Sequence, residues 1–269
     1  MRKFFGILVV AILSSLVLSV SASAVETVDI QADYVDEYLL QAVFADAVNN
    51  HANVATIRVN RAIADGETKN LADMLGNIQN MWTYRAPETF NYTRGTSIQT
   101  ISHGDSFDIR LLIGNGDGLD IETAYAQKQA AEAKAVEVYN SLVSDGVIPE
   151  GADDVVIARA ALDWVCANVT YINDDADMCH TAYSAFFNGY AVCDGYTSAY
   201  NLILKAAGIS CYGIKGWAGG CHEWTAAVIN GDLVYIDATW CDVDAYDAVD
   251  LSYFCIEPNA MTDHTAYYI

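Results

Sequence analysis

The pattern of hydrophobic and polar positions divides the chain into two regular parts separated by a break. In the first part, apolar residues at helical spacing predict helices over 36–48 and 70–82. Alternation of apolar and polar residues predicts strands over 54–59, 90–101 and 106–113. This mixture predicts a small α+β unit. The run Gly-Asn-Gly-Asp-Gly at 114–118 interrupts the pattern and marks the boundary of that unit.

The second part begins with helical patterns. Residues 124–142 are rich in Ala, Glu, Lys and Gln, which predicts a helix that Pro149 and Gly151 terminate. The next predicted helix is capped by Asp153-Asp154 and runs to about 168, with Val155 and Ala158 among its inward residues. A third helical pattern starts near 194 and ends at a glycine at 208.

The first 24 residues have the pattern of a secretory signal peptide. Arg2 and Lys3 are followed by an almost wholly apolar or small run over 4–20, and Ala-Ser-Ala at 22–24 is typical of a cleavage site. We therefore predict export and three parts: a signal peptide over 1–24, a small α+β domain over 25–118 and a second domain over 119–269. After cleavage we expect no membrane span.

Composition narrows the possible partners. The formal net charge is −22, from 13 basic and 35 acidic residues, and such a surface repels nucleic acid and anionic membranes. We expect a soluble acidic surface and no nucleic-acid partner. All seven cysteines lie in the second half. An exported protein can form disulfides, but an odd number leaves at least one thiol over, and Cys193 is the predicted free thiol.

Three short segments in the second half carry the chemistry. They contribute a thiol at Cys193, an imidazole at His222 and a carboxylate at Asp237, in that order. A thiol nucleophile needs a base to take its proton and a group that orients the base. These three residues are therefore the candidate catalytic residues, although each could separately have a structural role.

The surroundings of Cys193 favour a reactive thiol. The helical pattern that starts at 194 places Cys193 at or just before a helix N-terminus. The helix macrodipole favours the thiolate there. The N–H groups of the first helical turn have no partner within the helix, so they are available to bind an oxyanion.

A predicted hairpin brings the other two residues together. The dipeptide Asn-Gly at 230–231 lies between alternating apolar residues, which is a strong hairpin pattern. With a two-residue turn, His222 would oppose Thr239, and Asp237 would lie diagonal to His222 on the same face, about 7–8 Å away before the side chains extend. A three-residue turn would place Asp237 on the other face.

The sequence gives weaker support for a metal-binding function. The cysteines and histidines have no zinc-ligand spacing, and the acidic run at 173–177 lacks the glycine and distal glutamate of a calcium loop. We therefore expect no cofactor and no metal. His180 is expected to be structural, and the pattern identifies no partner for three further histidines: His51, His103 and His264.

Residues 161–264 resemble the transglutaminase-like superfamily. The segments that carry the resemblance are Cys-His-Thr-Ala-Tyr-Ser-Ala-Phe at 179–186, Asn-Gly at 188–189, Ala-Val-Cys-Asp-Gly-Tyr at 191–196, Ala-Gly-Ile at 207–209, His-Glu-Trp at 222–224 and Tyr-Ile-Asp-Ala-Thr-Trp at 235–240. The first half is also similar, more weakly, to the α+β segment that precedes this domain in exported bacterial members.

The resemblance implies a papain-like α+β fold, in which a helix carrying the cysteine packs on an antiparallel sheet carrying the histidine and aspartate. It implies Cys193 as nucleophile, His222 as base and Asp237 as orienting carboxylate. The chain departs from the usual pattern at 221, 223, 225 and 241. By strand parity, the side chains of Glu223 and Thr225 are expected to point away from the catalytic face.

We thus predict a secreted or cell-surface cysteine acyl-transfer enzyme that acts on protein or peptide amide bonds through a thioester. Resolution of the thioester by an amine gives a transglutaminase, and resolution by water gives a peptidase or amidase. A protein or peptide substrate, extracellular or from the cell wall, would be the partner. The alternative is a non-catalytic extracellular binding or scaffold module with the same fold.

Overall fold

A computed structural model describes most of the second half of the chain and parts of the first half. The described residues are 27–35, 39–40, 42–43, 46–47, 52, 54–64, 70–71, 97–112, 121–172, 179–243 and 248–267. The predicted signal peptide, the break at 114–118 and the acidic run at 173–177 lie outside them. No helix within this described part is both long enough and apolar enough to cross a membrane.

The N-terminal part contains a four-stranded sheet in the order β1-β2-β4-β3. Its strands are β1 (Thr27–Ala32), β2 (Val54–Val59), β3 (Ser97–Ser102) and β4 (Phe107–Leu112). The three predicted strands are confirmed where they are described. β1 was not predicted, and it pairs with β2 in parallel. The predicted helices over 36–48 and 70–82 are described only at a few positions, and those positions are helical.

A buried carboxylate ties this sheet together. Asp108 on β4 accepts two hydrogen bonds from Arg58 on β2, each 2.7 Å long, and lies 2.9 Å from His103 Nε2. The hydrogen bonds from Arg58 lower the pKa of Asp108 to about 2, against the opposing effect of burial. His103, for which the sequence identified no partner, therefore belongs to a structural ion cluster.

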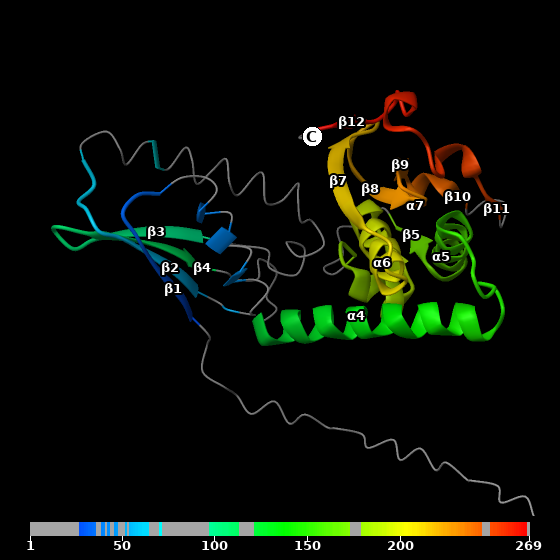
Figure 1. Cartoon of the computed structure of the whole chain (residues 1–269), viewed down its shortest axis with the longest axis horizontal. Coiled ribbons are helices and arrows are strands. Elements are labelled where there is room, and N and C mark those ends of the chain that lie inside the picture. Colours follow the sequence, from blue (N-terminus) through cyan, green and yellow to red (C-terminus); the bar gives the residue numbers. More distant parts are fainter. Residues whose placement is uncertain are drawn as a thin grey trace, which may run out of the picture.

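A long helix, α4 (Ile121–Ser144), packs against both parts of the molecule (Figure 1). Near its start, Tyr125 is buried in the N-terminal core and donates a hydrogen bond to the carbonyl oxygen of Ala52 at 3.2 Å. Further along, Ala131, Ala135 and Val138 are buried in the second core. The domain boundary at 118 itself stays a prediction.

The next helix, α5 (Asp154–Asn168), begins as the sequence predicts. Asp153 is its N-cap, and its side chain accepts a hydrogen bond from Val156 N at 3.0 Å. The prediction for Val155 was wrong, because its side chain is 38% exposed while Ala158 is fully buried. The first turn of α5 lies at the edge of the core, so the apolar stripe is covered only from its second turn.

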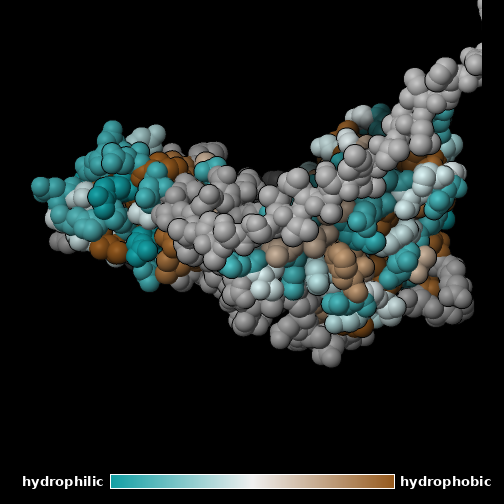
Figure 2. Space-filling model, turned by 90° about the horizontal axis from the view of Figure 1, so that it is seen from below, coloured by the Kyte–Doolittle hydropathy of each residue, from teal (hydrophilic) through white to brown (hydrophobic). Residues whose placement is uncertain are grey.

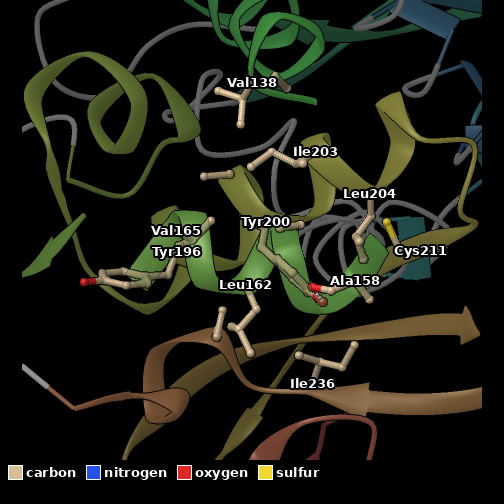
Figure 3. Close-up of a cluster of buried hydrophobic side chains, with 14 of the residues drawn as sticks. Val138, Ala158, Leu162, Val165, Tyr196, Tyr200, Ile203, Leu204, Cys211 and Ile236 are labelled. Atoms are coloured by element: carbon tan, nitrogen blue, oxygen red, sulfur yellow. Dashed lines mark hydrogen bonds between the residues drawn. The ribbon is translucent and has the colours of Figure 1, made fainter. Parts of the chain in front are cut away.

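The C-terminal part is built around a second four-stranded sheet, in the order β12-β7-β8-β9. Its strands are β7 (Cys211–Trp217), β8 (Cys221–Ile229), β9 (Asp232–Ile236) and β12 (Thr265–Ala266), and all their pairings are antiparallel. Helix α6 (Cys193–Ala206) packs on one face of this sheet. Figure 3 shows the core between them, with Tyr200, Leu204 and Ile236 inside.

Short elements complete the C-terminal part. They are β5 (Thr170–Tyr171), the π-helix η1 (Ser184–Asn188), β6 (Tyr190–Ala191), α7 (Ala238–Cys241), β10 (Asp242–Val243), β11 (Ala248–Val249) and the 3-10 helices η3 (Leu251–Tyr253) and η4 (Pro258–Ala260). The predicted α+β class, with a helix carrying the cysteine on an antiparallel sheet, is confirmed. Hydrophilic and hydrophobic residues are interspersed over the described surface in Figure 2.

Candidate functional site

Cys193 is the first residue of α6. Val192 precedes it in an extended conformation as the N-cap, and its carbonyl oxygen accepts the first helical hydrogen bond, from Tyr196 N at 3.0 Å. Gly195 allows this helix start to pack closely on its neighbours. A Cβ atom at Gly195 would lie 2.6 Å from the carbonyl oxygen of Cys179. The predicted helix start is therefore confirmed, and the position of the thiol depends on a glycine.

The predicted hairpin forms with the predicted register. Ile229 pairs with Asp232, and the following pairs continue to Thr225 with Ile236. Both turn residues have positive φ, 52° at Asn230 and 93° at Gly231, as a two-residue turn of this kind requires. The predicted pairing of His222 with Thr239 does not form, because β9 ends at Ile236.

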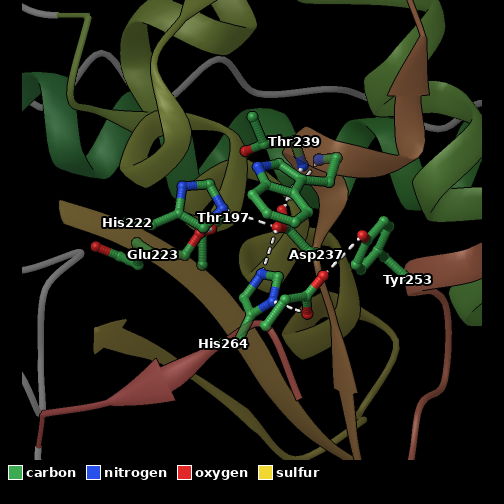
Figure 4. A network of polar contacts seen from close by, with 9 residues as sticks. Thr197, His222, Glu223, Asp237, Thr239, Tyr253 and His264 are labelled. Atoms are coloured by element: carbon green, nitrogen blue, oxygen red, sulfur yellow. Dashed lines mark hydrogen bonds and ion pairs between the residues drawn. The ribbon is translucent and has the colours of Figure 1, made fainter. Parts of the chain in front are cut away.

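Asp237 occupies the first position after β9 and has two roles. Its Oδ1 accepts hydrogen bonds from the backbone N–H groups of Thr239 and Trp240, at 3.0 and 3.1 Å, and so caps α7. Its Oδ2 lies 2.7 Å from His222 Nε2. Both side chains are buried. The cap holds the carboxylate next to the imidazole, and this proximity is the one that the predicted hairpin implies (Figure 4).

A second histidine shares the same carboxylate oxygen, and the sequence interpretation missed it. His264 Nε2 lies 3.0 Å from Asp237 Oδ2, and its Nδ1 lies 2.8 Å from Asp263 Oδ1 (Figure 4). The sequence pattern identified no partner for His264, and the structure shows two, Asp237 and Asp263. His264 directly precedes β12, which pairs with β7 through only two residues, Thr265 and Ala266. So short a strand leaves no detectable alternation in the sequence.

Aromatic rings enclose the two histidines. The Trp240 ring centroid lies 5.6 Å from that of His222 and 4.6 Å from that of His264. The fully buried ring of Trp224 stands edge-on to His264 at 4.9 Å. Both histidines are also buried. Electrostatic interactions among His222, Asp237 and His264 are stronger as a result.

Burial and nearby carboxylates set the state of the Cys193 thiol. Burial raises the pKa of Cys193, and the negative charges of Asp194 and Glu223 raise it further, while hydrogen bonds to the backbone at Glu223 and Asp194 act in the opposite direction. The sequence-based expectation that the helix start favours the thiolate is thus outweighed. The thiol is the resting form, and it must lose its proton to a base to react.

Contacts between α6 and β8 bring the start of α6 to the backbone next to His222. The Thr197 hydroxyl on α6 donates a hydrogen bond to the carbonyl oxygen of Glu223 at 3.0 Å. Cys193, one helical turn earlier, is hydrogen-bonded to the backbone at the same residue. Glu223 directly follows His222, so Cys193 lies next to the strand position that carries His222.

The expectation for Glu223 needs correction. Its side chain does lie on the strand face opposite to His222, as parity requires, but α6 covers that face. The carboxylate is buried and acts on the thiol pKa. Lys215 Nζ lies 3.8 Å from Glu223 Oε2 and 4.0 Å from Asp194 Oδ2. The sequence interpretation overlooked this lysine.

His180 also belongs to this surrounding. Its Nδ1 lies 2.9 Å from both carboxylate oxygens of Asp194, the residue after the candidate nucleophile. The sequence suggested a structural role for His180, and the contact with Asp194 is consistent with one. The pair fixes the first turn of α6, because Asp194 Oδ1 also accepts a hydrogen bond from Gly195 N at 3.1 Å.

All seven cysteines lie in the described part of the chain, and no disulfide joins any two of them. Within the same part, one group of three side chains has donor atoms within 4.8 Å of one another: His222, Asp237 and His264. Their separations of 2.7 and 3.0 Å are hydrogen-bond lengths, so the contacts among them explain the grouping.

Comparison with known proteins places the second half of the chain among known sequences. Residues 141–245, which include all three candidate residues, match the family model of the transglutaminase-like superfamily. Kyphoscoliosis peptidase of Mus musculus is 26% identical over 137 residues, which are 42% of this chain and 20% of that protein. The Homo sapiens protein of that name is 25% identical over 130 residues, 41% of this chain and 19% of that protein. The chain thus spans about a fifth of these relatives.

Solved structures give a weaker match. A crystal structure described as that of a TGase is 14% identical, with a TM-score of 0.35, and the match covers 78% of this chain and 59% of that one.

Proposed function

Residues 141–245 belong to the transglutaminase-like superfamily, and on that basis we propose that this chain is a cysteine acyl-transfer enzyme acting on protein or peptide amides. One observation carries the proposal. The buried carboxylate of Asp237 lies 2.7 Å from Nε2 of the buried His222, and Cys193 starts the helix packed beside that strand. In this role Cys193 is the nucleophile, His222 the base and Asp237 the group that orients the base.

The orientation of His222 assigns its two nitrogens. Asp237 is ionised, because hydrogen bonds from His222 and His264 lower its pKa although burial alone would raise it. A carboxylate accepts hydrogen bonds, so Nε2 of His222 carries a proton. The other nitrogen, Nδ1, is then the atom that accepts the thiol proton of Cys193.

The proposed reaction passes through a tetrahedral oxyanion and a thioester. As Nδ1 of His222 takes the thiol proton, Sγ of Cys193 attacks the amide carbonyl carbon and a tetrahedral oxyanion forms. The backbone N–H of Cys193, which has no partner within the helix, is the candidate oxyanion donor. Collapse breaks the C–N bond, the amine leaves with the proton from His222, and a thioester remains. A water molecule or a second amine, deprotonated by His222, attacks the thioester and releases Cys193.

An assay with two readouts tests this function. We propose to incubate the wild type and Cys193→Ala with casein and a fluorescent primary amine. Incorporation of the amine by the wild type alone identifies a transglutaminase, and new peptide ends without incorporation identify a peptidase. Cys221→Ala is the matched control, because it removes an exposed thiol and leaves Cys193 in place.

The proposal fails if Cys193→Ala retains the wild-type activity. It also fails if neither product forms and the Cys193 thiol of the folded wild type is inert to iodoacetamide, which would favour the non-catalytic module. Export remains part of the proposal, and an N-terminus that begins after Ala24 in the secreted protein would support it.

A further inference from the structure

His264, the residue before β12, makes contacts that a cysteine, a base and an orienting carboxylate do not require. Its ring lies between two carboxylates, 3.0 Å from Asp237 Oδ2 through Nε2 and 2.8 Å from Asp263 Oδ1 through Nδ1. The side chain is fully buried. Figure 4 shows His222 and His264 each joined to Asp237 by a dashed line.

These contacts determine the protonation state of His264. An ionised carboxylate only accepts hydrogen bonds, so each ring nitrogen must donate one. A neutral imidazole has a single N–H, and His264 is therefore an imidazolium cation. Burial opposes this charge, but the hydrogen bonds to Asp237 and Asp263 outweigh it and raise the pKa of His264. The rings of Trp224 and Trp240 both stand edge-on to this imidazolium.

The titratable groups that face His264 come from each neighbouring element. They are Asp237 after β9, the adjacent Asp263, His222 on β8, whose ring centroid lies 5.7 Å away, and Tyr253 on η3. The Tyr253 hydroxyl donates a hydrogen bond to Asp263 Oδ2 at 2.9 Å, which holds that carboxylate against the imidazole.

We propose that His264 is a positioning residue that, as an imidazolium held by Asp263, fixes Asp237 toward His222 and sets the pH range in which Cys193 reacts. The proposal rests on the proposed roles of Cys193 and His222. Asp237 Oδ2 contacts both imidazoles, His222 at 2.7 Å and His264 at 3.0 Å. The positive charge of His264 disfavours a second proton on His222.

The expected size of this effect follows from the geometry. Two unit charges whose centres are 5.7 Å apart interact with an energy that corresponds to about 0.5–2 pH units, for effective dielectric constants between that of water and about 20. Removal of the charge should move the acid limb of Cys193 reactivity upward by that amount.

The test measures the rate of Cys193 alkylation by iodoacetamide against pH, with the modified peptides quantified by mass spectrometry. We expect the acid limb of His264→Gln to lie about 0.5–2 pH units above that of the wild type. Asp263→Asn should shift it in the same direction, because His264 then loses its proton more easily, and Asp263→Glu should restore the wild-type profile. Alkylation of the exposed Cys221 is the internal reference.

A second measurement does not depend on catalysis. In protein labelled with ¹⁵N-histidine, His264 should show two protonated nitrogens at pH 7 in the wild type and one in Asp263→Asn at higher pH. A neutral His264 in the wild type would overturn the proposal, and so would a folded His264→Gln with an unchanged acid limb. If His264→Gln does not fold, Asp263→Asn decides, since the Asp263 side chain is 48% exposed. An inactive wild type with these NMR and alkylation results would refute only the proposed reaction.

Discussion

Replacement of Asp237 by asparagine separates the orientation of the base from the stability of the fold. The side-chain oxygen of asparagine can still accept the hydrogen bonds from Thr239 N and Trp240 N that cap α7. The amide NH₂ then takes the place of Oδ2 and faces Nε2 of His222, which was 2.7 Å from that oxygen. An NH₂ group only donates, so Nε2 of His222 must accept.

The change of tautomer is expected to inactivate the site. When Nε2 accepts, the proton of the neutral imidazole moves to Nδ1, and His222 no longer takes the Cys193 proton. Loss of a positioned base typically costs about 10²–10⁴-fold in rate, and we expect a loss of that size in Cys193 alkylation at pH 7. The raised pKa of Cys193 strengthens this expectation, because little thiolate forms without a base.

The fold should lose much less. The asparagine NH₂ can donate to the Nε2 atoms of both histidines, so charge-assisted hydrogen bonds are replaced by neutral ones rather than left unmade. We expect the free energy of unfolding to fall by about 1–3 kcal/mol, as measured by urea denaturation. A cooperative transition with a modest shift of its midpoint would confirm that the lost reactivity is not a consequence of unfolding.

Asp250→Asn supplies the matched control. Asp250 also caps a short helix, η3, by accepting a hydrogen bond from Ser252 N at 2.8 Å, and the substitution removes the same charge. Cys193 in this control should react at the wild-type rate. Cys193 reactivity in Asp237→Asn within twofold of the wild type, with Cys221 unchanged in both proteins, would refute the assignment of Asp237.

Two further predictions concern the helix start and pH. Gly195→Ala should abolish Cys193 reactivity with iodoacetamide, because the new Cβ would lie 2.6 Å from the Cys179 carbonyl oxygen and would displace the first turn of α6; circular dichroism should show the remaining helices intact. The folded-state pKa of His264 is raised above its ordinary value of 6.5, so its contribution to stability is complete below about pH 6.5 and lost as pH rises through the raised pKa. The unfolding free energy of the wild type should therefore fall over that range by more than that of His264→Gln, and equal slopes would contradict the charge on His264.

The parts of the site that were predictable depend on local sequence. Asn230 and Gly231 favour a two-residue turn. The turn fixes which residue of β8 pairs with which residue of β9. The relation of His222 to Asp237 follows from that register, although the two are 15 residues apart. Cys193 was predictable for the same reason, since the apolar spacing after it indicates where α6 begins.

The parts that were missed depend on contacts between distant segments. His264 reaches Asp237 across 27 residues, and the strand after it has only two paired residues, which gives no periodicity to detect. β1 is similar, because its parallel partner β2 lies more than 20 residues further along the chain. Lys215 is within 4 Å of Asp194 and Glu223 only because α6 folds onto β7 and β8.

The state of the thiol shows why such contacts matter for chemistry. A helix N-terminus considered alone favours a thiolate, and the backbone hydrogen bonds at Asp194 and Glu223 do act in that direction. Burial and the carboxylates of the same two residues outweigh them, and the pKa of Cys193 is raised. A thiol that rests protonated depends on its base for reactivity. In this chain, therefore, the buried contacts of His222 with Asp237, and of Asp237 with His264, should control the nucleophile more strongly than the helix that carries it.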